Sequence, residues 1–176
     1  MNMSVSGVNV NEDMNKGKAL PTGWRWVYLK DICSISANQV DPMLPEYSGL
    51  PHVGPENIES GSGKMMNVRS AATDGMISGK YLFKAGTVLY SKIRPYLRKA
   101  ALAEMSGLCS ADIYPLDTSN DIVDRQYFVW LLLSPNFTHF ADSESRRARM
   151  PKINRDQLYS YRTILPPLAE QKRIAA

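Results

Sequence analysis

The most constraining feature of this 176-residue chain is its last segment, where a strand pattern gives way abruptly to a helix pattern. Residues 161–165 have the apolar and β-branched side chains of a short strand, and Pro166 and Pro167 end it, because proline has no N–H to donate to a sheet. Pro167 suits a first helical position, and helix-forming residues follow it. The helix has only about two turns before the sequence stops, a length that is marginal alone. We therefore expect residues 166–176 to be the start of a longer helix, cut just inside it.

Length and composition favour one globular domain. A chain of 176 residues with 44% hydrophobic content can bury a sizeable core, and its longest apolar run is far shorter than the roughly 20 residues of a membrane span. Residues 1–19 are rich in Asn, Ser, Gly and Met and lack the apolar centre of a signal peptide, so we expect a disordered leader. Cys33 and Cys109 are too few for a disulfide framework and are expected to be buried thiols. These features predict a cytoplasmic protein.

Charge is sorted along the chain into blocks, although the net charge is only +4. Residues 80–100 contain six basic side chains and residues 146–155 contain five, with no acidic side chain in either block. Residues 101–145, between them, contain one basic and seven acidic side chains. Clustered Lys and Arg are typical of surfaces that bind nucleic-acid phosphates, and the Arg fork also fits the guanine edge, whereas the alternative is an ordinary solvated surface. The predicted DNA-binding residues are Lys92, Arg94, Tyr96, Arg98 and Lys99 in the first block, Arg146, Arg147, Arg149 and Lys152 in the second, and His52 outside both.

The pattern of predicted elements indicates the α+β class. Strands are predicted at residues 24–28, 50–58, 87–93, 98–105, 109–114 and 161–165, with a hairpin turn at Ser106-Gly107. The strongest helix pattern covers residues 121–133, where Asp121 is the expected cap and Trp130 is expected on the buried face. Ser134-Pro135 predicts the start of a second helix. We expect a curved, mainly antiparallel sheet with helices packed on one side, followed by the start of the long C-terminal helix.

Four segments, in this order, resemble the target-recognition domain of specificity (S) subunits of type I restriction-modification systems. They are LPTGW at residues 20–24, HVGPENI at 52–58, GTVLYSKIRPYLRK at 86–99 and PPLAEQKRI at 166–174. The resemblance implies that residues 20–165 form a DNA-binding domain and that residues 166–176 begin a conserved spacer helix. The residues of this helix expected to face a partner are Leu168, Glu170, Gln171 and Ile174.

The resemblance also implies a function and partners. In this family each recognition domain reads one half of a bipartite target in double-stranded DNA, and the helices set the gap between the halves. Modification subunits, which bind S-adenosylmethionine, methylate adenine, and a restriction subunit translocates and cleaves DNA at the expense of ATP. The chain is therefore expected to bind double-stranded DNA, modification subunits and a restriction subunit, to avoid membranes, and to hold no cofactor.

No catalytic or metal-binding residue is predicted. The sequence DPML at residues 41–44 lacks the second proline and the aromatic residue of an adenine methyltransferase motif, and no phosphate-binding loop occurs. Glu170 and Lys172 resemble half of a nuclease site but have no suitable aspartate partner, so we expect solvated charges. His139, between Phe137 and Phe140, is expected to be structural. The chain is therefore predicted not to be an enzyme.

Three other functions remain open at this point. The chain could be the recognition module of a fused single-chain restriction enzyme and methyltransferase. It could be a generic binder of RNA or single strands, although such proteins expose aromatic residues for base stacking and most aromatic residues here have the spacing of a helix core. It could also be an interaction module whose basic blocks meet an acidic protein.

Overall fold

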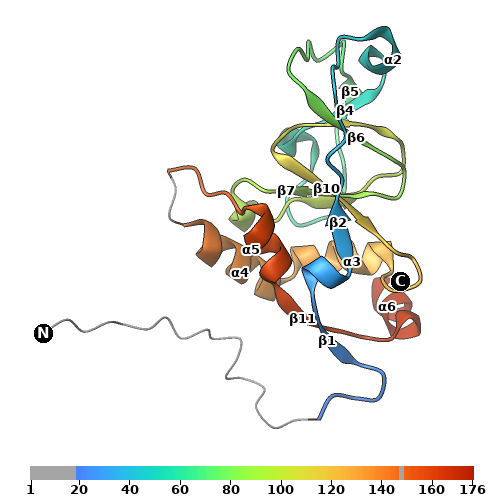
Figure 1. The fold of residues 1–176 in the computed structure, drawn as a ribbon, viewed down its shortest axis with the longest axis vertical. Coiled ribbons are helices and arrows are strands. Elements are labelled where there is room, and N and C mark those ends of the chain that lie inside the picture. Colours follow the sequence, from blue (N-terminus) through green and yellow to red (C-terminus); the bar gives the residue numbers. More distant parts are fainter. Residues whose placement is uncertain (1–18, 147–148) are drawn as a thin grey trace, which may run out of the picture.

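The computed structural model describes residues 19–146 and 149–176 (Figure 1). The predicted leader up to residue 18, and Arg147, lie outside the described residues. The strands are β1 (Arg25–Tyr28), β2 (Cys33–Ile35), β3 (Gln39–Val40), β4 (Pro51–Val53), β5 (Arg69–Ser70), β6 (Lys80–Phe83), β7 (Val88–Ser91), β8 (Ala100–Leu102), β9 (Gly107–Cys109), β10 (Ile113–Thr118) and β11 (Arg162–Leu165). The helices are α2 (Pro45–Ser48), α3 (Arg125–Leu133), α4 (Pro135–Ser145), α5 (Arg155–Ser160) and α6 (Leu168–Ala175), with short 3-10 helices η1 (Leu29–Asp31), η2 (Pro55–Asn57) and η3 (Pro95–Leu97).

The described strands form three sheets. β1 pairs with β11, four strands follow the order β2-β10-β7-β8, and five follow the order β3-β6-β9-β4-β5. The pairings are antiparallel except for β4 and β9. Figure 1 shows α3, α4 and α5 below the four-stranded sheet, on the side away from the five-stranded sheet. The predicted α+β class with a mainly antiparallel arrangement is confirmed, and the one curved sheet that we expected is divided into three.

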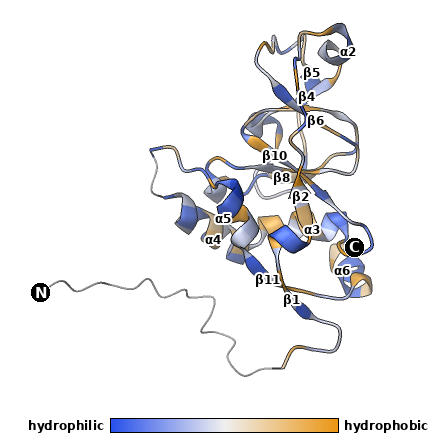
Figure 2. Ribbon diagram, in the orientation of Figure 1, coloured by the Kyte–Doolittle hydropathy of each residue, from blue (hydrophilic) through white to orange (hydrophobic). Residues whose placement is uncertain are grey.

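The four-stranded sheet is the central layer, because both of its faces are buried. Along β7, Val88 and Tyr90 belong to a core shared with the helices, whereas Leu89 belongs to a second core shared with the five-stranded sheet. This alternation is the period-two pattern of a strand, here with apolar side chains on both faces. Figure 2 shows the apolar residues concentrated on α3 and along these central strands.

The helix boundaries follow from capping. Ser134 caps α4 as predicted, since its Oγ accepts a hydrogen bond from the N–H of Phe137 at 3.2 Å. The predicted start of α3 is wrong: the cap is Asp124, whose Oδ1 accepts from Tyr127 N–H at 2.9 Å, and not Asp121. The position of Trp130 is also wrong, because its side chain is 39% exposed, whereas Val129 and Leu132 beside it are buried.

The chain around Ser106 differs from the prediction. β8 pairs with β7 in the four-stranded sheet, whereas β9 pairs with β6 and β4 in the five-stranded sheet, so the two strands do not form a hairpin. The single strand predicted at residues 109–114 is also wrong, because Ser110 accepts a hydrogen bond from Ile113 N–H and makes a turn between β9 and β10. These turns move the chain from one sheet to the other, which alternation of apolar residues alone does not reveal.

The termini of the domain meet. β1 and β11 pair along their full length, from Arg25 opposite Leu165 to Tyr28 opposite Arg162. The strand predicted at the end of the chain is therefore confirmed, and it delivers α6 to the end of α3 (Figure 1). Pro167 precedes α6 as its N-cap rather than as its first residue. In the part of the chain that the structure describes, no helix is both long and apolar enough to cross a membrane.

Candidate nucleic-acid interface

The two basic blocks, about 50 residues apart in sequence, are joined by their backbones. Ile93 and Lys152 form an antiparallel bridge. Arg94 N–H donates to the carbonyl of Pro151 at 2.8 Å, and Ile153 N–H donates to the carbonyl of Lys92 at 3.0 Å. The structure thus brings together two predicted segments that the acidic residues 101–145 separate in the sequence.

These backbone contacts bring together four basic residues, which we call the basic cluster: Lys92, Arg94, Lys152 and Arg155. Burial is the main cause that lowers the pKa of the half-buried Lys92 below its usual value, and the positive charges of Lys152 and Arg155 lower it further. The nearby carboxylate of Asp112 opposes this shift. Positive charges that lie close together repel one another, so the binding of an anion such as a phosphate would relieve the repulsion.

Lys92 is also fixed by an aromatic ring. Its Nζ lies 5.0 Å from the centroid of the Tyr114 ring, a distance at which a cation is attracted to the ring face. The hydroxyl of Tyr114 donates to the carbonyl of Ile153 at 3.1 Å. Tyr114 therefore links β10 to both basic blocks, and it holds Lys92 beside Lys152.

The turn η3 follows directly and presents Tyr96 to solvent. Arg94 and Arg98, at its two ends, have the left-handed backbone conformation, with φ of 48° and 51°. This conformation is uncommon for residues with a Cβ and costs free energy that surrounding contacts must offset. Tyr96 lies between them and is 52% exposed. The geometry of this turn therefore displays one aromatic side chain.

Arg98 and Lys99 do not point away from the protein. The Nε and Nη2 atoms of Arg98 donate to the carbonyl of Leu133, at 3.0 and 2.7 Å, and so cap the C-terminal end of α3. Lys99 Nζ donates to the carbonyl of Pro55 at 2.6 Å. The DNA-binding role predicted for these two residues thus competes with contacts inside the domain, and their observed contacts hold η3 in place.

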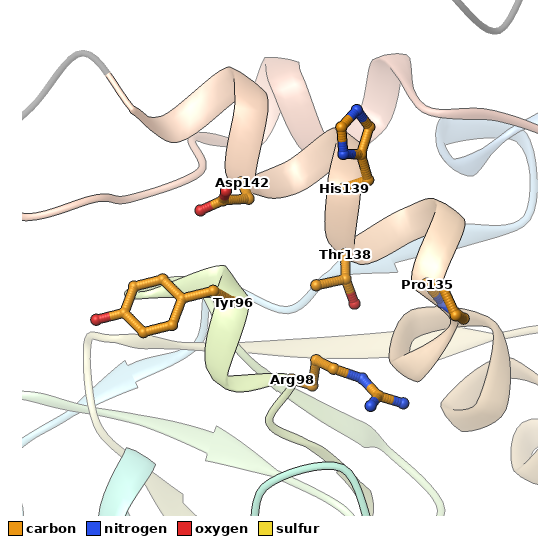
Figure 3. Close-up of a pocket in the computed structure, with 6 residues that line it drawn as sticks. All are labelled: Tyr96, Arg98, Pro135, Thr138, His139 and Asp142. Carbon is orange, nitrogen blue, oxygen red and sulfur yellow. The ribbon is translucent and has the colours of Figure 1, made fainter.

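A pocket of about 330 Å³ lies between η3 and α4. Figure 3 shows Tyr96 and Arg98 on one side of it and Thr138, His139 and Asp142 on the other. His139, which was expected to be structural, is exposed on α4. Because Asp142 adds negative charge, this pocket is less suited to phosphate than the basic cluster.

The basic side chains of the second block differ in whether they are paired with an acidic residue. Arg149 and Lys152 are exposed. Arg146 is also exposed but is paired with Asp142, with Nη2 and Oδ2 2.8 Å apart across one helical turn. Surface ion pairs of this kind are weak, so a stronger anion can displace Asp142. Arg155, at the start of α5, was counted in the block but was not predicted to bind DNA, and only the fold shows its proximity to Lys92.

His52 is buried, with 2% of its surface exposed. Its Nδ1 lies 3.3 Å from Oδ2 of Asp74. A side chain enclosed in this way does not reach DNA, so the structure contradicts the prediction that His52 contacts it. The neighbouring Asn57 is equally enclosed and bonds to the backbone of the segment at 66–67. The sequence segment 52–58 thus serves the interior of the domain.

The residues predicted to face a partner helix divide into two groups. Gln171 is fully buried and makes three hydrogen bonds inside the domain, to Ile122, Asp124 and Pro166, so the structure contradicts a partner-facing role for it. Glu170 pairs with Arg173 on the surface of α6. The exposed residue available to a partner is Ile174, with Leu168 half-buried.

Within residues 19–146 and 149–176, no group of three or more His, Cys, Asp or Glu side chains is arranged to hold a metal ion. The two Cys side chains are both buried, as predicted.

Comparison with known proteins gives the family. A family model described as "Type I restriction modification DNA specificity domain" matches residues 21–176. The specificity subunit of the type I restriction enzyme EcoDI from Escherichia coli is 35% identical over 156 residues, which are 89% of this chain and 34% of that protein. The chain therefore spans about a third of the length of this relative.

Two solved structures show the same fold. The HsdS subunit from Thermoanaerobacter tengcongensis matches with a TM-score of 0.75 at 24% identity, over 91% of this chain and 42% of that one. The S subunit of a type I restriction-modification system from M. genitalium matches with a TM-score of 0.55 at 15% identity, over 92% of this chain and 38% of that one. The resemblance drawn from four sequence segments is confirmed by the family match over nearly the whole described chain. The chain belongs to the type I restriction modification DNA specificity domain family.

Proposed function

We propose that this chain recognises double-stranded DNA and reads one half of a bipartite target, as part of the specificity subunit of a type I restriction-modification complex. The observation that carries the proposal is the basic cluster. A backbone bridge brings four basic residues from two distant segments together, and an aromatic ring contacts one of them, Lys92. A rigid surface of this charge suits the evenly spaced phosphates of a duplex.

The exposed turn η3 supports the same function. It lies immediately beside the basic cluster, because Arg94 of the cluster directly precedes it as its N-cap, and it displays Tyr96. Phosphate contacts set the register of a protein on a duplex, whereas side chains that reach the grooves read the bases. We assign the basic cluster to the first task and the loops around it to the second.

The partners follow from the family. The relative at 35% identity is named a specificity subunit of a type I restriction enzyme, and another structure with this fold was solved in work on complex assembly of the type I R-M system. We infer that modification and restriction subunits supply methylation and cleavage, that the chain itself is not catalytic, and that it acts in the cytoplasm. Ile174 and Leu168 on α6 are the side chains that we assign to a neighbouring helix.

A single-strand or RNA binder is less well supported. Such proteins stack bases on exposed aromatic rings. Here Tyr90, Phe128 and Phe137 are fully buried, and Phe137 packs edge-on against Tyr90 with 5.5 Å between ring centroids. These rings stabilise the core and cannot stack on bases.

The test is selection of binding sites from a randomised duplex pool by this chain at two salt concentrations. We expect a short motif of about three to five base pairs to be enriched, and binding to weaken steeply as salt rises. Salt-sensitive binding without any enriched motif would reduce the proposal to unspecific DNA binding. If single-stranded DNA or RNA competes for the chain as well as duplex DNA does, the result would favour the single-strand or RNA binder.

A further inference from the structure

A second polar surface lies beyond η3, on the five-stranded sheet. A groove of about 660 Å³ is lined by side chains that include Glu56, Asn67, Arg69, Asp74 and Met76. The turn η2, which carries Glu56, is joined to the residues that follow η3. Lys99 Nζ donates to the carbonyl of Pro55, and the N–H of Gly61 donates to the carbonyl of Arg98. Arginine and asparagine are the residue types that read guanine and adenine edges, so the groove has the chemistry of base recognition.

The segment that carries Arg69 is held rigidly from below. The buried side chain of Asn57 donates from Nδ2 to the carbonyls of Met66 and Asn67, at 3.2 and 3.1 Å. Its Oδ1 accepts from the N–H of Gly54 at 2.9 Å, so both ends of the side-chain amide bond to backbone groups. Asn67 has a left-handed backbone, with φ of 52°, which these bonds help to maintain.

The turn that follows Arg69 is also fixed. Asp74 N–H donates to the carbonyl of Ser70 at 3.0 Å, and the N–H groups of Ala71 and Ala72 donate to the carbonyls of Leu50 and Ser48. Asp74 is thereby placed above β4 and β5. Its Oδ2 lies 3.3 Å from Nδ1 of His52.

A polar chain therefore runs from the interior to the surface. His52 is buried opposite Arg69 in the pairing of β4 with β5, and Asp74 contacts both. Nη2 of Arg69 lies 2.6 Å from Oδ1 of Asp74, as an ion pair rather than an aligned hydrogen bond. The Arg69 side chain nevertheless remains 63% exposed, so it is restrained but presents most of its N–H donors outward.

We propose that Arg69 is a base-reading residue of this domain, which recognises the O6 and N7 edge of one guanine in the major groove, and that Asp74 positions it. This inference rests on the proposed function. A long arginine side chain loses much rotamer freedom when it binds, and a side chain restrained in advance loses less. His52 and Asn57 contribute indirectly, since they hold the turn and the strand that present Arg69.

The test compares the motifs that the full chain and its Arg69→Ala variant enrich from the same randomised duplex pool. We expect the variant to lose preference for guanine at one position by about five-fold or more, while the other positions keep their preference. Asp74→Asn, which removes the charge that restrains Arg69, should weaken preference at the same position by a smaller factor. Lys64→Ala is the matched control, because it removes an exposed positive charge from the same segment and should leave every position unchanged.

The outcomes are distinguishable. If Arg69→Ala enriches the full motif with uniformly weaker binding, Arg69 contacts phosphate and the inference is overturned. If the variant keeps the wild-type thermal melting but loses preference at every position, reading of a single base is likewise refuted. If the wild-type chain itself enriches no motif, the proposed function fails, and the role of Arg69 fails with it.

Discussion

The side-chain Oε1 of Gln171 accepts a hydrogen bond from the backbone N–H of Asp124 at 2.8 Å, and this bond joins α6 to the capping residue of α3. The same side chain donates from Nε2 to the carbonyls of Ile122 and Pro166, at 3.0 and 2.9 Å. At the other end of α3, Arg98 caps the carbonyl of Leu133. One helix thus connects the predicted spacer helix to the turn beside the basic cluster.

Substitution of Gln171 by Leu should destabilise the domain by about 1–3 kcal/mol. The buried carbonyl of Pro166 and the partly buried backbone groups of Asp124 and Ile122 would lose their partner. The measurement is urea unfolding followed by circular dichroism. Lys172→Ala, which changes an exposed neighbour, should change the free energy of unfolding by no more than about 0.5 kcal/mol. An equal effect of both substitutions would show that Gln171 does not connect the two helices.

Substitution of Arg98 by Ala should lower stability and DNA binding through the same contact. The loss of the charged bonds to the Leu133 carbonyl is expected to cost about 1.5 kcal/mol, at the lower end for charged donors since Arg98 is only half-buried. Thermal unfolding measures this directly. A variant with unchanged stability but strongly reduced duplex binding would instead return Arg98 to the direct DNA contact that its sequence position predicted.

The two cysteines should be unreactive in the folded protein. Burial raises the pKa of each thiol from 9.0 to about 12, although the charge of Lys92 slightly opposes the shift for Cys109. The thiolate is the reactive form, so labelling by a disulfide reagent at pH 8 should be slow in buffer and fast in denaturant. Rapid labelling of both thiols in the native protein would contradict this burial.

The same shifts predict a pH dependence of stability. A thiol whose pKa is higher in the folded than in the unfolded state contributes stability that is complete below pH 9 and is lost as the pH rises toward 12. The free energy of unfolding should therefore decline above pH 9, and a Cys109→Ala variant should show a shallower decline. The comparison of the two slopes separates the thiols from the tyrosines, which titrate in the same range.

Local signals in the sequence predicted the elements that depend on neighbouring residues. The Ser134-Pro135 start of α4 follows from capping, and the end of the strand at Leu165 follows from the missing N–H of proline. The sorting of charge along the sequence identified the two basic blocks at residues 80–100 and 146–155. Their contact depends on the bridge between Ile93 and Lys152, which is a tertiary interaction that no local pattern encodes.

Two errors among the site residues share one physical cause, which is the direction of side chains. Gln171, on a polar helix, has the residue type of a surface position, yet it turns inward to satisfy three backbone groups. His52 has the residue type of a ligand or DNA contact, yet it is enclosed beneath Asp74. A polar side chain is buried where it can make hydrogen bonds to buried polar groups. The positions of those groups are known only once the fold is known.

The salt dependence of duplex binding by Lys92→Ala and Lys152→Ala, measured by fluorescence anisotropy, tests whether the two basic blocks bind phosphates together. If the two basic blocks form one phosphate-binding surface, each substitution should reduce the slope of log affinity against log salt by about one. Lys30→Ala, which changes an exposed lysine of η1 outside the basic cluster, should leave the slope unchanged. Slopes that stay at the wild-type value in both variants would show that the two basic blocks do not form one phosphate-binding surface.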